Sequence, residues 1–151
     1  MKTRALRLYG KDALRLEEFE LPAIKDNEIL AKVVCDSICM SSYKAAHQAD
    51  THKRVPRNIA THPILIGHEF AGEIVEVGAK WQKEYKAGEK FSIQPALNWA
   101  GGPNGLQGAI GYSYEYIGGD ATYVVIPNEV MELGCLLHFG GEGFYPAALS
   151  E

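Results

Sequence analysis

The chain has 151 residues, which is enough for one domain around a single hydrophobic core and too few for a second full domain. Hydrophobic residues make up 46% and charged residues 23%, as in folded globular proteins, so a disordered or fibrous chain is excluded. The net charge of −4 argues against nucleic acid or an anionic membrane surface as a partner, and no apolar run approaches the roughly 20 residues that span a bilayer.

The first residues alternate charged and aliphatic side chains, which is typical of a strand and unlike a signal peptide. Three cysteines, Cys35, Cys39 and Cys135, are an odd number in a chain that can bury a core without disulfides. We therefore expect reduced thiols and a cytoplasmic location.

Taken in chain order, the sequence predicts short strands with few helices. Residues 4–9 and 13–18 flank a short glycine-containing turn and predict a β-hairpin. Further strands are expected at 28–38, 64–66, 70–77, 91–93 and 121–127. Serines 41 and 42 can cap a short helix over 41–47, and residues 143–151 resemble the start of another.

Two segments lack the pattern of either a strand or a helix. Residues 50–62 are polar and basic and predict a loop, whereas 95–119 are rich in glycine and aromatic residues and predict an ordered surface excursion. The whole pattern favours a mainly β domain with a few short helices, an antiparallel sheet curled into a partly open barrel. The sequence contains no Gly-x-Gly-x-x-Gly motif, so a dinucleotide cofactor would have to be held by residues outside it.

The most specific local feature is the stretch GHEFAGEIVEVG at 67–78, which places His68 and Glu69 side by side at a turn. Cys39 lies upstream, directly after a predicted strand. A thiolate with an imidazole is a ligand mixture that suits a catalytic zinc ion with an open position. Such a site needs a third protein ligand, and Glu69 and Glu151 are the candidates.

Each of these residues also has an ordinary structural interpretation. Cys39 alone could be a small buried hydrophobic residue, His68 a hydrogen-bonded structural histidine, and Glu69 a solvated charge. We assign Cys35 and Cys135 to packing. The remaining histidines are assigned to surface or core roles: His47, His52, His62 and His138.

A basic cluster lies between Cys39 and His68 in an otherwise acidic chain: His52, Lys53, Arg54 and Arg57. It could contact a phosphate or sugar hydroxyls, or it could simply be a solvated loop. Similarly, Trp99 and the tyrosines at 112, 114 and 116 could wall a cleft, form a subunit contact or pack locally.

The order of these motifs along residues 1–151 resembles the N-terminal catalytic domain of zinc-dependent medium-chain alcohol and polyol dehydrogenases, which is a GroES-like partly open β-barrel. The resemblance is strongest to their polyol and sugar-phosphate branch. It implies zinc, hydride exchange between NAD(P) and the carbinol or carbonyl of a polyol, sugar or sugar phosphate, and a homo-oligomer for the full-length enzyme. It also implies that the nucleotide-binding domain lies outside this chain, which should be inactive alone.

Carried over position by position, the resemblance implies that Cys39 and His68 are zinc ligands. It implies that Glu69 ligates or flanks the metal and that Glu151 faces it directly or through water. Ser41 corresponds to the hydroxyl residue that binds the substrate oxygen and begins the proton relay.

One departure concerns the support of the histidine ligand. Ser42 stands where the family carries an aspartate that orients the imidazole, which predicts another support for His68 or loose zinc binding. The family's four-cysteine structural zinc lobe has no counterpart in 95–119, so we expect one metal site. Two alternatives stay open: a metal-free reductase of the same superfamily, and a non-enzymatic assembly module resembling a co-chaperonin.

Overall fold

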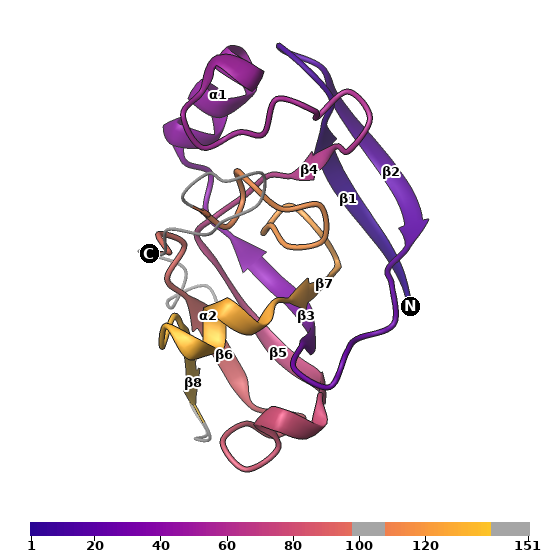
Figure 1. The fold of residues 1–151 in the computed structure, drawn as a ribbon, viewed down its shortest axis with the longest axis vertical. Helices are drawn as coiled ribbons and strands as arrows, with labels where there is room; N and C mark the ends of the chain where they lie inside the picture. The colour runs from indigo at the N-terminus through magenta and orange to yellow at the C-terminus, as the bar shows by residue number, and fades with distance from the viewer. Residues whose placement is uncertain (98–107, 140–151) are drawn as a thin grey trace.

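The computed structural model describes residues 1–97 and 108–139, which form two antiparallel sheets (Figure 1). The smaller sheet has the order β2-β1-β4, with β1 at Lys2–Leu8, β2 at Leu14–Glu20 and β4 at Ile64–Leu65. The larger sheet has the order β7-β3-β5-β6-β8. Its strands are β3 (Ile29–Asp36), β5 (Phe70–Val77), β6 (Lys90–Ile93), β7 (Tyr123–Ile126) and β8 (Leu136–Phe139).

Short helical segments complete the described fold. They are α1 (Met40–Gln48), α2 (Asn128–Glu132) and the 3₁₀ turns η1 (Ala49–Thr51) and η2 (Ala79–Trp81). The two sheets meet through an isolated bridge between Ala5 and Ala121, and the described strands do not close into one ring. The mainly β, partly open barrel expected from the sequence is thus confirmed.

Most of the strand predictions agree with the structure. The hairpin pairs β1 with β2 in antiparallel register, with Leu6 opposite Leu16, and β5 spans the predicted residues. The strand predicted at 28–38 is shorter, since β3 ends at Asp36. Helix α2 and strand β8 were not predicted from the sequence, and the helix start expected at 143–151 lies outside the described residues.

Two of the three hydrophobic clusters in the described fold contain most of its buried side chains. In the larger, the fully buried rings of Phe70 and Phe91 meet edge to face, with centroids 6.1 Å apart. In the smaller, α1 packs Ala45 and its neighbours against side chains from β1 and β4. Cys135 is buried in the larger cluster, in keeping with a packing role.

The antiparallel pairing of β3 and β5 brings the polar ends of several elements together. The end of β3 at Asp36 lies opposite the start of β5 at Phe70, and α1 begins shortly after β3 ends. The Ser37 amide donates to the Glu69 carbonyl at 2.9 Å, which continues the pairing one step beyond the strands. Segments distant in sequence therefore converge between β3, α1, β4 and β5.

The turn between β4 and β5 depends on Gly67. Its φ of +89° is unfavourable for residues with a Cβ, and a Cβ here would lie 2.5 Å from the Asp120 amide nitrogen. The Gly67 carbonyl also accepts a hydrogen bond from the Gly119 amide at 2.8 Å. The turn is therefore clamped against residues 119–120, in a conformation and a space that only glycine fits.

Among the described residues, no helix combines the length and the apolar character that crossing a membrane requires.

Gly67→Ala should destabilise the fold more than Gly88→Ala. Both glycines have φ near +88°, but a Cβ at Gly88 would meet nothing within 4 Å. Gly88→Ala should therefore cost only the backbone strain, about 1 to 2 kcal/mol. Gly67→Ala should cost about 1 to 3 kcal/mol more, because the backbone of residues 119–120 must move. Urea unfolding of both variants measures the difference, and equal losses would contradict the clamped turn.

Candidate metal centre

The structure brings Cys39, His68 and Glu69 together, with one potential ligand atom from each lying within 4.8 Å of the others. Cys39 is the N-cap residue of α1, and the other two lie in the turn between β4 and β5. His68 is buried, whereas Cys39 and Glu69 are partly exposed. The cluster is thus buried at His68 and accessible to solvent at Cys39 and Glu69.

The donor set and spacing fit a zinc ion. His68 Nε2 and Glu69 Oε1 are 3.7 Å apart, close to the roughly 3.3 Å between two tetrahedral ligands each about 2.0 Å from zinc. Sulfur, imidazole nitrogen and carboxylate oxygen are all common zinc donors. Three such ligands leave one tetrahedral position for water or substrate.

Ser42 itself contacts the imidazole, and this contact is a support for His68 other than the family's aspartate, as one of the two expectations had it. Ser42 Oγ lies 3.1 Å from His68 Nδ1. If Nδ1 carries the proton it donates to that hydroxyl, and Nε2 keeps its lone pair for a metal. A serine in the first turn of α1 thus makes the contact expected of the missing carboxylate.

The helix start also differs from the prediction. The helix begins at Met40, and Cys39 rather than a serine caps it, with Cys39 Sγ accepting a long hydrogen bond from the Ser41 amide at 3.5 Å. The same backbone geometry therefore orients the thiol toward the start of the helix and leaves the hydroxyls of Ser41 and Ser42 free for other contacts.

Tyr112 is a site residue that the sequence indicated only as one of several tyrosines near a cleft. Its hydroxyl lies 3.2 Å from His68 Nε2, and its ring stacks on His52 with centroids 5.5 Å apart. Burial raises the pKa of Tyr112, and a hydrogen bond with the Ser41 side chain opposes that shift. A neutral hydroxyl therefore lies beside both the imidazole and Ser41.

Two carboxylates behind the cluster were also missed. Asp36 Oδ1 accepts a hydrogen bond from the Glu69 amide at 3.0 Å. Burial, together with the negative charge of Asp120, raises the pKa of Asp36 to about 7. Burial also raises the pKa of Asp120 and lowers that of His68, while the nearby carboxylates of Glu69 and Asp120 oppose the shift of His68. The surroundings therefore favour a neutral imidazole and a bound cation.

Not every predicted residue can be placed relative to the cluster. Glu151 and Trp99 lie outside the described residues, so Glu69 is the candidate third ligand that the described cluster contains. Ser41 is exposed, and its amide contacts Cys39 Sγ of the cluster. Cys35 is half-buried and does not belong to the cluster.

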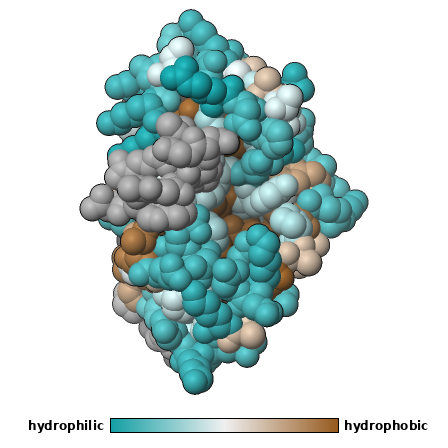
Figure 2. Space-filling model, viewed as in Figure 1, coloured by the Kyte–Doolittle hydropathy of each residue, from teal (hydrophilic) through white to brown (hydrophobic). Residues whose placement is uncertain are grey.

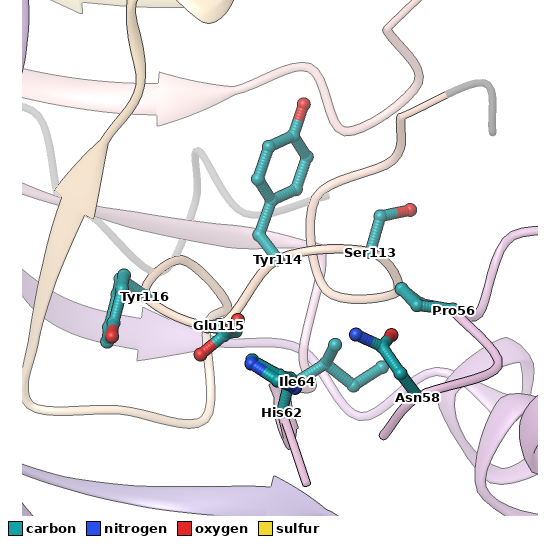
Figure 3. A pocket seen from close by; sticks show the side chains of 8 residues that line it. All are labelled: Pro56, Asn58, His62, Ile64, Ser113, Tyr114, Glu115 and Tyr116. Atoms are coloured by element: carbon teal, nitrogen blue, oxygen red, sulfur yellow. The ribbon is translucent and has the colours of Figure 1, made fainter. Parts of the chain in front are cut away.

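A cavity of about 480 Å³ opens along β1 and β2 and is lined by Arg4, Leu6, Leu16 and residues 120–122. A cavity of about 390 Å³ is lined by residues of the 56–64 and 113–116 segments and by none of the three clustered residues (Figure 3). Figure 3 shows the Tyr114 side chain pointing away from His62 and Asn58, and its hydroxyl donates to Glu129 Oε1 at 3.0 Å. A smaller cavity of about 190 Å³ is lined by Ser41, Lys44, His52, Lys53, Arg54 and Tyr112, and so adjoins the cluster.

Residues 25–134 match the model of the alcohol dehydrogenase GroES-like domain. The chain is 53% identical to L-sorbose 1-phosphate reductase of Klebsiella pneumoniae over 149 residues, which cover 99% of this chain and 35% of that protein. It is 45% identical to mannitol-1-phosphate 5-dehydrogenase of Aliivibrio fischeri over 150 residues, covering 99% and 34%. The chain belongs to the alcohol dehydrogenase GroES-like domain family, and it spans about a third of the length of these curated relatives.

A solved structure supports the fold. The crystal structure of 2R,3R-butanediol dehydrogenase from Bacillus subtilis superposes with a TM-score of 0.73 at 24% identity. The match covers 98% of this chain and 43% of that one. At this identity the match establishes the shared fold alone.

Ser42→Ala should weaken zinc binding by about 10- to 100-fold, because the imidazole loses the group that fixes its orientation. The matched control is Ser41→Ala, which removes the neighbouring hydroxyl without touching His68 Nδ1 and should change zinc affinity little. Competition titration against a chromophoric chelator measures both affinities. Equal zinc affinity of Ser42→Ala and the unmodified chain would show that Ser42 does not orient the ligand.

Proposed function

We propose that this chain is the catalytic domain of a zinc-dependent oxidoreductase. The enzyme exchanges hydride between NAD(P) and the carbinol or carbonyl carbon of a polyol, sugar or sugar phosphate. The observation that carries the proposal is the convergence of Cys39, His68 and Glu69 at a partly exposed position. The names of the two curated relatives support the substrate class.

In this proposal Cys39, His68 and Glu69 hold the zinc ion, and Glu151 is the alternative third ligand. When bound, zinc supplies a Lewis acid that polarises the substrate oxygen, and NAD(P) accepts or donates the hydride. The buried side of His68 is fixed by Ser42, so the imidazole keeps one orientation while the exposed side of the cluster admits substrate.

The proton of the reacting hydroxyl leaves through this chain's own residues. Ser41 lies at the exposed mouth of the cluster and shares a hydrogen bond with Tyr112. The Ser41 hydroxyl can accept the proton of a carbinol and pass its own proton outward to solvent, and it acts in reverse during carbonyl reduction. Tyr112, whose raised pKa keeps its hydroxyl protonated, can donate to or accept from the Ser41 hydroxyl.

The dinucleotide is assigned to residues outside this chain. The sequence contains no Gly-x-Gly-x-x-Gly motif, and the curated relatives are about three times as long as the matched region. We therefore expect the 151-residue chain to bind zinc and part of the substrate without turning it over.

Two alternatives predict different behaviour of the isolated chain. A metal-free reductase would use the same barrel without taking up zinc, and an assembly module would form rings without metal. The compact sulfur, nitrogen and oxygen donor set favours the zinc enzyme over both.

The Cys39→Ala variant should lose stoichiometric zinc, because the metal then keeps only nitrogen and oxygen donors from the described cluster. Cys35→Ala is the matched control, since Cys35 is a free cysteine outside the cluster. Elemental analysis gives the zinc content. Cobalt substitution should give a sulfur-to-cobalt charge-transfer band that disappears in Cys39→Ala and persists in Cys35→Ala. A chain that takes up neither metal would contradict the proposed function.

A further inference from the structure

The small cavity beside the cluster carries an inference that deepens the proposed function. It has a volume of about 190 Å³ and lies between the start of α1, which contributes Ser41 and Lys44, and the segment 52–54. The remaining wall is the ring of Tyr112. Of the basic cluster noted in the sequence, His52, Lys53 and Arg54 line this cavity together with Lys44 from α1, whereas Arg57 does not.

The positive charges at this cavity are uncompensated within the part of the chain that the structure describes. No carboxylate in that part forms an ion pair with Lys44, Lys53 or Arg54. Burial lowers the pKa of His52, and the nearby charges of Lys44, Arg54 and Lys53 lower it further. Three cations facing one hollow in a chain of net charge −4 are arranged to attract an anion.

The cavity adjoins the proposed reaction site through two shared residues. Tyr112 lines the cavity and also lies 3.2 Å from His68 Nε2, and Ser41 lines it while its amide contacts Cys39 Sγ. A molecule whose anionic group occupies the cavity can therefore extend its other end to the cluster.

We propose that this cavity binds the phosphate group of a phosphorylated substrate, with Lys44, Lys53 and Arg54 as its ligands. A phosphate monoester carries a charge of about −1.5 to −2 at neutral pH, which matches several cations better than a carboxylate does. The arginine fork can bind two phosphate oxygens at once, and each lysine adds a point charge. The assignment rests on the proposed function for the rest of the substrate.

The cavity of about 480 Å³ does not compete for this role, because its single arginine, Arg4, is accompanied by Asp120. The cavity of about 390 Å³ does not compete either. Its lining includes Glu115, and its other polar groups are a histidine, an asparagine, a serine and tyrosines, without a lysine or an arginine (Figure 3). The end of the molecule that α1 forms is mostly hydrophilic, which suits a polar phosphorylated ligand (Figures 1 and 2). The phosphate is therefore assigned to the smaller cavity.

The test is a titration of inorganic phosphate into the full 151-residue chain, with the backbone amide signals monitored by nuclear magnetic resonance. Signals of residues lining the small cavity should shift with saturation. The variant Lys44→Gln/Lys53→Gln/Arg54→Gln should bind at least about tenfold more weakly, since each charged hydrogen bond contributes substantially. The control Lys11→Gln/Lys83→Gln/Lys86→Gln removes the same total charge at exposed positions away from the cavity and should leave the affinity within about twofold.

Equal weakening by the two triple variants would overturn the proposal, because only the net charge would then matter. Zinc content is measured on every variant. Zinc uptake without phosphate binding at the cavity overturns the phosphate assignment alone, and phosphate binding there without zinc uptake overturns the proposed function alone.

In the full-length enzyme, the cavity variant should lower the ratio of kcat/KM for a hexitol phosphate to kcat/KM for the same hexitol without phosphate at least about tenfold. A parallel loss for both substrates would show that the three residues support the fold instead of recognising phosphate. Retained amide dispersion in the spectrum of the variant excludes simple unfolding.

Discussion

The candidate site depends on how the turn between β4 and β5 is held against the end of β3. Asp36 accepts the Glu69 amide on one side, and the residues around Gly119 contact Gly67 on the other. Neither contact involves a ligand atom, yet together they fix where His68 and Glu69 stand. The Asp36 carboxyl, whose pKa burial and the nearby Asp120 raise to about 7, thus holds the turn through its contact with the Glu69 amide rather than through a permanent charge.

The first turn of α1 supplies the complementary half of the site. Cys39 caps the helix, Ser42 reaches the buried nitrogen of His68, and Ser41 faces the opening beside Tyr112. These three positions lie within four residues, so one helix start presents a sulfur donor, a support for the other ligand and an exposed hydroxyl. The strand pairing of β3 with β5 then sets the distance between this helix start and the turn.

The sequence predicted the hairpin, the main strands and the partly open barrel, because alternating hydrophobicity and glycine-bearing turns are local signals. It also singled out Cys39, His68 and Glu69, which the structure gathers. It could not identify which group supports His68, since whether a serine can replace an aspartate depends on a distance across the fold. Asp36 and Asp120 carry no local signature, Tyr112 was indicated only as one of several tyrosines, and only the packing of separate segments reveals their positions. Helix α2 and strand β8 are too short for their periodicity to stand out.

In sequence, the segment 49–63 lies between Cys39 and the pair His68 and Glu69. It also forms part of the wall of the small cavity. It contributes none of the clustered donor atoms, and its fold is anchored independently by buried Val55 and Ile59. Substitutions at its exposed side chains would therefore reshape the wall of the cavity while leaving the three donor residues in place.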